Sequence, residues 1–199
     1  MPSLWRRLTA TQRAEVLRYR QKLQRPWHRP PHFEQGCIHY HLTAACYNHQ
    51  PIIGATPERM AEFSESLLEA LPTHPAAWCV LPNHYHLLIR TDDLKAAIKS
   101  LTRLHGRTSY EWNGKDSQRG RKIWHGVSDR GMRSAGHFWA TLNYIHHNSV
   151  HHGYAEQWTE WPFSSAGSFL DEIGRDAAAE LWRTHPILSY GQGWDDSDL

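Results

Sequence analysis

The chain has 199 residues, 40% hydrophobic and 21% charged, a composition typical of a soluble globular domain that buries roughly 70% of its unfolded surface. No apolar run is long enough for a transmembrane helix, and the Arg-rich N-terminus lacks the apolar stretch of a signal peptide. The three cysteines form no CxxC pair, which favours reduced thiols in the cytoplasm over a disulfide framework or a zinc knuckle.

The net charge of +2 hides an uneven distribution. Residues 1–133 carry 20 Lys and Arg against 11 Asp and Glu, whereas residues 134–199 carry 2 against 9. A basic body favours a polyanionic partner such as nucleic acid, and an acidic tail limits non-specific binding.

In chain order, the first 34 residues contain eight Lys and Arg and end in a proline-rich stretch, which predicts a basic arm with an extended linker. A first strand is expected in residues 36–47, where apolar side chains alternate with His39 and His41. A helix should follow, because Thr56 suits an N-cap and Pro57 the first helical position.

Residues 78–90 predict a β-hairpin, since Pro82 and Asn83 suit a tight turn between two apolar runs. Alternation along the second strand places His84 and His86 on one face and Tyr85 on the other. Two imidazoles on one face can hold a divalent cation, although a solvated polar face explains them as well. His39 and His41 form a competing His-x-His pair.

Asp92 or Asp93 is expected to start a second helix with a buried apolar stripe. Its exposed face carries basic residues at every fourth position, and such a ladder of like charges favours contact with phosphates over a merely solvated surface. These residues are Lys95, Lys99, Arg103 and Arg107. A last strand is expected in residues 121–127, and 129–133 is basic again.

The predicted order is strand, helix, strand, strand, helix, strand. This is the α+β, ferredoxin-like βαββαβ pattern, an antiparallel sheet with helices on one face and the other face open for a ligand. Ser134 should cap an added C-terminal helix that ends near Gly153. Tyr144 and Asn148 lie one turn apart on this helix and share a face.

These elements together suggest a reaction. A cation held by His84 and His86 needs further ligands, and the Asn148 carboxamide could supply one. Tyr144 would then face a phosphate bound to that cation and attack it to form a covalent ester. Taken alone, a tyrosine at a helix surface is usually structural, so the combination carries the argument.

At these positions the sequence resembles a known family. The segment LPNHYHLL at 81–88 resembles the HUH motif of single-tyrosine transposases. The segments NYIHHNSV at 143–150 and WPFSS at 161–165 resemble the tyrosine helix and following segment of the REP-associated tyrosine transposases. The resemblance spans about residues 36–169, so we predict a basic N-terminal arm (1–34), an HUH single-tyrosine transposase domain (35–169) and an acidic C-terminal extension (170–199).

The resemblance implies that His84, His86 and Asn148 bind Mg²⁺ or Mn²⁺ and that Tyr144 is the nucleophile, and it favours this histidine pair over His39 and His41. It implies a cytoplasmic, nucleoid-associated enzyme, monomeric or homodimeric and not membrane-bound, that cleaves and rejoins single-stranded DNA near REP hairpins through a 5′-phosphotyrosine intermediate. The expected DNA-binding residues are Lys95, Lys99, Arg103, Arg107, Arg121, Lys122, Arg130 and Arg133. Ser149 departs from the proline usual in the family, which could loosen the helix end.

Two other functions compete with this one. The first is a metal-dependent nuclease that uses water as its nucleophile, in which Tyr144 is structural. The second is a non-catalytic protein that binds nucleic-acid hairpins. A denaturing gel separates the three, because they yield a covalent adduct, free cleavage products, or no product at all.

Overall fold

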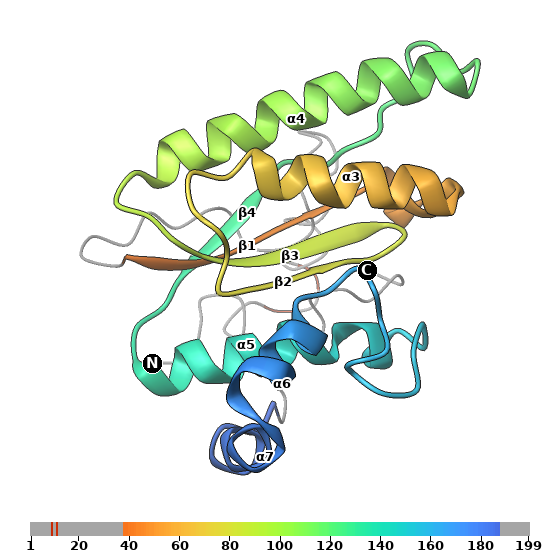
Figure 1. Cartoon of the computed structure of the whole chain (residues 1–199). Helices are drawn as coiled ribbons and strands as arrows, with labels where there is room; N and C mark the ends of the chain where they lie inside the picture. The colour runs from red at the N-terminus through yellow and green to blue at the C-terminus, as the bar shows by residue number, and fades with distance from the viewer. Residues whose placement is uncertain (1–8, 10, 12–37, 188–199) are drawn as a thin grey trace.

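The computed structural model describes residues 38–187 together with residues 9 and 11, and an antiparallel sheet forms its centre (Figure 1). The strands are β1 (His39–Ala45), β2 (Ala77–Val80), β3 (His84–Arg90) and β4 (Ser128–Gly131), in the spatial order β2-β3-β1-β4. Helix α3 (Pro57–Glu69) connects β1 to β2, and α4 (Leu94–Lys115) connects β3 to β4. The predicted ferredoxin-like α+β topology is therefore confirmed.

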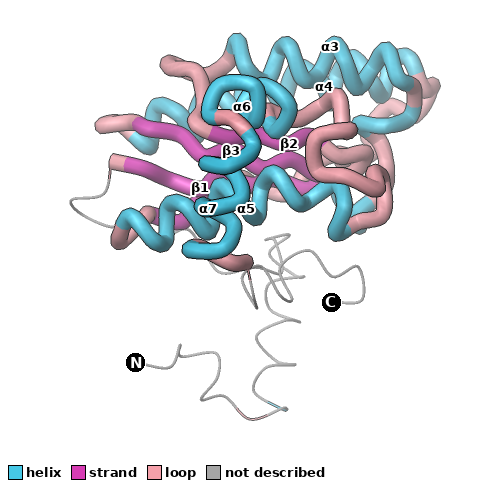
Figure 2. Tube along the Cα trace, turned by 60° about the horizontal axis from the view of Figure 1, so that its bottom comes forward, coloured by secondary structure: helices cyan, strands magenta, loops and turns pink. Residues whose placement is uncertain are grey.

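Helices lie on both faces of this sheet (Figures 1 and 2). Helices α3 and α4 cover one face, and α5 (Ala135–His151) packs against β2 and β3 on the other. The prediction that the second face is open is therefore wrong. Leu142 and Ile145 of α5 are buried against Leu81 and Leu88, so an apolar contact closes this face. Helices α6 (Ala166–Ile173) and α7 (Arg175–Thr184) follow on the same side.

The main apolar core lies between the sheet and the α3/α4 layer. Alternation sends Leu42 of β1 and Tyr85, Leu87 and Ile89 of β3 into this core, where all four are almost fully buried. Phe63 of α3 packs among them. Each such side chain contributes roughly 1.5–3 kcal/mol when it leaves water, so this layer supplies much of the stability of the fold.

The helices begin where the sequence predicts. Thr56 Oγ1 accepts a hydrogen bond from the Arg59 amide at 3.1 Å, and Asp93 Oδ1 accepts one from the Ala96 amide at 2.9 Å. Ser134 Oγ accepts one from the His137 amide at 3.1 Å. A cap of this kind typically contributes about 1 kcal/mol, because it satisfies an amide with no partner inside the helix.

The predicted strand in residues 121–127 is wrong, since the fourth strand is Ser128–Gly131. Within the predicted range, Trp124 forms only an isolated bridge with Cys46. Its indole is buried instead, stacks on His105 at 4.2 Å and donates to Thr108 Oγ1 at 3.0 Å. The β-rich composition of this segment therefore reflects core packing against α4.

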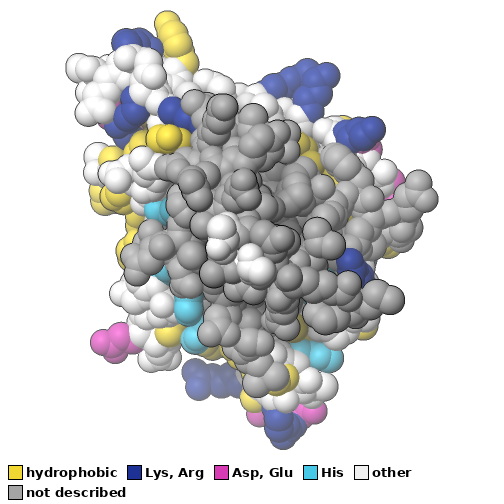
Figure 3. Space-filling view, turned by 180° about the vertical axis from the view of Figure 1, so that it is seen from behind, with side chains coloured by type: hydrophobic (Ala, Val, Ile, Leu, Met, Phe, Trp, Pro, Cys, Tyr) yellow, Lys and Arg dark blue, Asp and Glu magenta, His cyan; other side chains and the backbone are white. Residues whose placement is uncertain are grey.

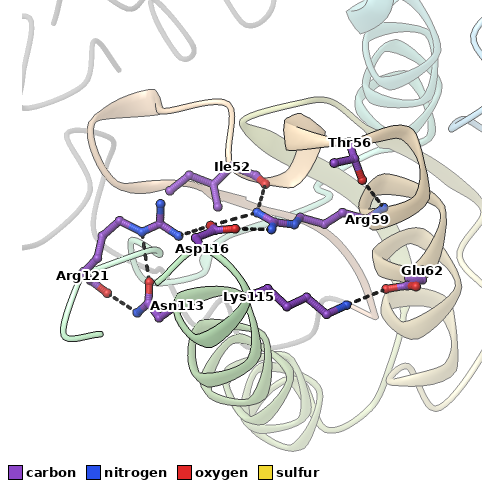
Figure 4. Close-up of polar contacts among 8 residues, drawn as sticks. All are labelled: Ile52, Thr56, Arg59, Glu62, Asn113, Lys115, Asp116 and Arg121. Carbon is purple, nitrogen blue, oxygen red and sulfur yellow. Dashed lines mark hydrogen bonds and ion pairs between the residues drawn. The ribbon is translucent and has the colours of Figure 1, made fainter. Parts of the chain in front are cut away.

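An ion-pair network fastens this segment to the two helices of the same layer (Figure 4). Asp116, just after α4, accepts hydrogen bonds from Arg59 of α3 and, at 2.6 Å, from Arg121. Arg121 also donates to Asn113 Oδ1 at 3.0 Å. The hydrogen bonds from Arg59, followed by those from Arg121, lower the pKa of Asp116 to about 2, so the carboxylate stays ionised throughout the neutral range.

Within the described residues, no helix combines the length and the apolar character needed to cross a bilayer. The predicted basic arm lies outside the described residues apart from residues 9 and 11, as do residues 188–199 of the acidic extension. The division into three segments, with its two boundaries, stays a prediction.

Candidate active site

The two histidines of β3 lie on the sheet face that α5 covers. Tyr85 between them points the opposite way, as its place in the strand predicts: its side chain is fully buried, and its hydroxyl is hydrogen-bonded to His105 Nε2 at 3.0 Å. Burial raises the pKa of the Tyr85 hydroxyl. This tyrosine is therefore a core residue, as expected.

The Pro82–Asn83 turn holds the His84 ring. The Leu81 amide donates to the His84 carbonyl at 2.8 Å, which closes the hairpin. Asn83 Nδ2 donates to the His49 carbonyl at 3.2 Å, so Asn83 Oδ1 faces His84 Nδ1, at 2.7 Å. Because Oδ1 only accepts, the His84 proton lies on Nδ1 and the lone pair on Nε2.

The turn is also tied to the segment before α3. The Gly54 amide donates to the Pro82 carbonyl at 3.0 Å. A Cβ at Gly54 would lie 2.5 Å from Pro82 Cβ, so the close approach of the two backbones requires glycine.

Helix α5 brings Tyr144 and Asn148 to the same face. Asn148 is fully buried, and its Oδ1 lies 3.2 Å from His84 Nε2. The Tyr144 ring lies 5.3 Å from the His86 ring and is 4% exposed. The structure therefore brings together the four residues that the sequence predicts as ligands and nucleophile, from two elements about 60 residues apart in the chain.

His41 belongs to the same cluster. Its Nε2 lies 3.0 Å from His86 Nδ1, and its ring is 6.0 Å from that of Tyr144. In the sequence, His39 and His41 compete with His84 and His86 as candidate metal ligands. Because β1 and β3 are neighbouring strands, one face of the sheet carries both motifs. The position of His41 could have been predicted, because the ferredoxin-like order makes β1 and β3 neighbours and alternation places His41 on the face of His86. His39 instead packs edge-on against Phe138 at 5.1 Å.

Two donor atoms of this cluster have the spacing of neighbouring ligands on a small divalent cation. Octahedral Mg²⁺ holds its ligands at about 2.0–2.1 Å, so adjacent ligands lie about 3 Å apart. His84 Nε2 and Asn148 Oδ1 are 3.2 Å apart and face each other with lone pairs. Among the described residues no three His, Cys, Asp or Glu side chains form a metal group by themselves, so a cation here would depend on the Asn148 amide and on oxygens of the DNA or water.

The predicted DNA-binding residues are not all near this cluster. The α4 ladder of Lys95, Lys99, Arg103 and Arg107 is exposed, but α4 covers the opposite face of the sheet from α5. In the view from behind, the visible Lys and Arg side chains occupy separate positions instead of one patch (Figure 3).

The four remaining basic residues have different surroundings. Arg121 is paired with Asp116, and Lys122 Nζ lies 4.6 Å from the centre of the Tyr47 ring. Arg133 is exposed just before α5. Arg130 is the cross-strand partner of His41, which places it on the sheet face of the histidines. Of the predicted set, Arg130 is therefore best placed to meet a phosphate near Tyr144.

Two further histidines of this region were not predicted as functional. The His152 ring lies 5.0 Å from that of His84. His146 is fully buried, with its Nε2 2.9 Å from Ser165 Oγ and its ring stacked on Trp158. Burial lowers the pKa of His146 to about 3, which keeps the ring neutral and marks it as a packing residue.

Comparison with known proteins agrees with this geometry. Residues 35–147 match the family described as "Transposase IS200 like". The chain belongs to the IS200-like transposase family. The matched range contains His41, His84, His86 and Tyr144 and ends one residue before Asn148.

A relative of this transposase is a curated protein of Haemophilus influenzae described as a REP-associated tyrosine transposase. It is 30% identical over an alignment of 135 residues, and the match covers 60% of this chain and 72% of the relative. A solved REP-associated tyrosine transposase bound to a REP hairpin aligns with a TM-score of 0.52 and 20% identity, over 79% of this chain and 89% of that one. The resemblance inferred from the sequence is confirmed, and the structural match supports the fold.

Proposed function

We propose that this transposase-family protein cleaves and rejoins single-stranded DNA beside hairpins through a covalent bond between Tyr144 and the DNA. The observation that carries the proposal is the position of Tyr144 and Asn148 against His84 and His86. Hairpin DNA is the proposed partner because a solved protein of the same fold is bound to a REP hairpin.

The proposed reaction exchanges one phosphate ester bond for another. The Tyr144 oxygen bonds to phosphorus and the bond to the 3′ oxygen of the upstream strand breaks. The phenol proton leaves to solvent, and the 3′ oxygen takes up a proton from solvent. The upstream strand then ends in a free 3′-hydroxyl, and the downstream strand is held as a 5′-phosphotyrosine. Attack by a 3′-hydroxyl reverses the step and restores the DNA strand.

The surrounding residues orient this reaction. His84, His86 and Asn148 would hold Mg²⁺ or Mn²⁺, which when bound supplies electrostatic stabilisation of the charge that builds up on the phosphate. The hydrogen bond from His84 to Asn83 fixes the ring so that Nε2 faces Asn148. Packing of α5 on the sheet fixes the Tyr144 ring beside His86.

One observation favours a second candidate. Tyr144 is only 4% exposed, whereas an attacking hydroxyl has to reach a DNA phosphate. A protein that binds hairpin DNA without cutting it has no such requirement.

A labelled hairpin-bearing single strand incubated with the protein and Mn²⁺, then resolved on a denaturing gel, separates these functions. We expect a covalent adduct that retains a 3′-end label and releases a 5′-end label. Tyr144→Phe should abolish the adduct but not DNA binding, whereas Tyr110→Phe, on the exposed face of α4, should form it normally. Free products without an adduct would indicate a water-using nuclease, and a shifted complex alone on a native gel would indicate the binding protein.

A further inference from the structure

The contact between His41 and His86 is as short as a direct hydrogen bond. The two nitrogens, His41 Nε2 and His86 Nδ1, lie 3.0 Å apart, and the side chains are 3% and 0% exposed. Between two neutral imidazoles at this distance one ring donates and the other accepts. The direction of this bond decides which nitrogen of His86 carries the lone pair.

The strands hold the two rings in place. His41 lies in the middle of β1, between Leu88 on β3 and Arg130 on β4. Residue 43 is paired with His86, and Thr43 Oγ1 donates to the Tyr85 carbonyl at 2.9 Å. His41 is therefore the diagonal neighbour of His86 on one face, and a sheet paired on both sides fixes that relation.

The two histidines of β3 have different partners at Nδ1. For His84 the group at Nδ1 is Asn83 Oδ1, which only accepts, so the lone pair of His84 lies on Nε2. For His86 the group at Nδ1 is the His41 ring. If His41 accepts, both histidines present an Nε2 lone pair, which is the form that binds a metal ion; if His41 donates, the His86 proton lies on Nε2 and blocks that nitrogen.

We propose that His41 is a positioning residue, which accepts the Nδ1 proton of His86 and so leaves the Nε2 lone pair of His86 for the metal ion. The metal part of this inference rests on the proposed function. The tautomer is a property of the metal-free protein and can be tested without it.

The first test is the long-range ¹H–¹⁵N spectrum of histidine-labelled, metal-free protein, with His86 assigned from the signal lost in His86→Gln. We expect His86 to carry its proton on Nδ1. A proton on Nε2 overturns the proposal. This test is made on protein in which His41 is not mutated.

The second test is Mn²⁺ binding measured by electron paramagnetic resonance. Loss of an outer partner of a ligating histidine typically weakens metal affinity about 10- to 100-fold, which is the effect expected for His41→Ala. His41→Gln should recover part of it, since its amide oxygen can accept the same proton. The matched control is His39→Ala, because His39 lies on the same strand face but packs on Phe138.

The outcomes distinguish this inference from the proposed function. A wild-type protein that binds no Mn²⁺ refutes the metal assignment itself. A wild-type protein that binds Mn²⁺ no more tightly than a folded His41→Ala variant refutes the role of His41 and leaves the metal assignment standing.

Discussion

The two faces of the sheet differ although they are built from the same strands. On the α3/α4 face, β3 presents Tyr85, Leu87 and Ile89 to an apolar core. On the α5 face, β3 presents the alternate residues, among them His84 and His86, which are just as buried. Neighbouring residues of β3 therefore point to different surfaces, one that stabilises the fold and one that carries the candidate active site.

Burial has opposite effects on the free energy of folding on the two faces. In the apolar core it removes carbon from water and stabilises the fold. Around Tyr144 it places imidazoles and an amide in a poorly hydrated site, which costs free energy unless each group has a partner. Such a cluster is expected where function requires it, and Leu142 and Ile145 supply the apolar contact that holds α5 over it.

The largest effect is expected on the α5 face. Replacing both His84 and His86 with Ala should reduce DNA cleavage to background, because both proposed metal ligands of β3 are lost. Binding of hairpin DNA should change little, since affinity comes mainly from phosphate contacts. Cleavage on a denaturing gel and binding by anisotropy measure the two effects, and cleavage that survives in a folded double variant would place the site elsewhere.

The same kind of change on the core face should act on stability. Tyr85→Ala should lower the free energy of unfolding by about 3–5 kcal/mol, because it leaves a cavity among Phe63, His105 and Trp124. Tyr85→Phe keeps the ring and should cost about 1–3 kcal/mol through the lost partner of His105. Urea unfolding measures both, and equal costs would mean that the hydroxyl, not the ring, carries the stability.

Acid should destabilise both layers by the same mechanism. Burial lowers the pKa of His105 in α4 and of His146 in α5 to about 3, from an ordinary value of 6.5. The unfolded chain therefore binds two protons that the folded protein does not, and stability falls as the pH drops through this window. Between about pH 5.5 and 4 the two groups together contribute a slope of roughly 3 kcal/mol per pH unit.

Single variants separate the contributions of the two histidines to this pH dependence of the free energy of unfolding. His105→Gln and His146→Gln should each remove about half of it, as measured by urea unfolding at several pH values. A slope unchanged in either variant would show that the corresponding histidine is protonated in the folded protein.

The smallest effect concerns the α4 ladder, on the opposite face from Tyr144. Each phosphate contact contributes about 0.7 to the salt slope for single strands, so replacing Lys99 and Arg103 with Gln should flatten log K against log salt by about 1.4. Arg121→Gln is the matched control, because Asp116 already pairs with this cation. A slope that changes with Arg130→Gln but not with the ladder would confine DNA to the α5 face.

The local features of this protein could be predicted from its sequence because they depend on neighbouring residues. The caps at Thr56, Asp93 and Ser134, the alternation of His84, Tyr85 and His86, and the one-turn spacing of Tyr144 and Asn148 all follow from the period of a helix or a strand. The order of these elements also predicts the ferredoxin-like topology.

Only the tertiary structure decided the rest. The wrong strand at 121–127 shows that a β-rich pattern can serve core packing, since Trp124 stacks on His105 instead of extending the sheet. The covering of the second face depends on where α5 docks, and the meeting of His41 with His86 joins residues 45 positions apart. Contacts of this range depend on strand order and register, and a register shift of one residue would send His41 to the opposite face.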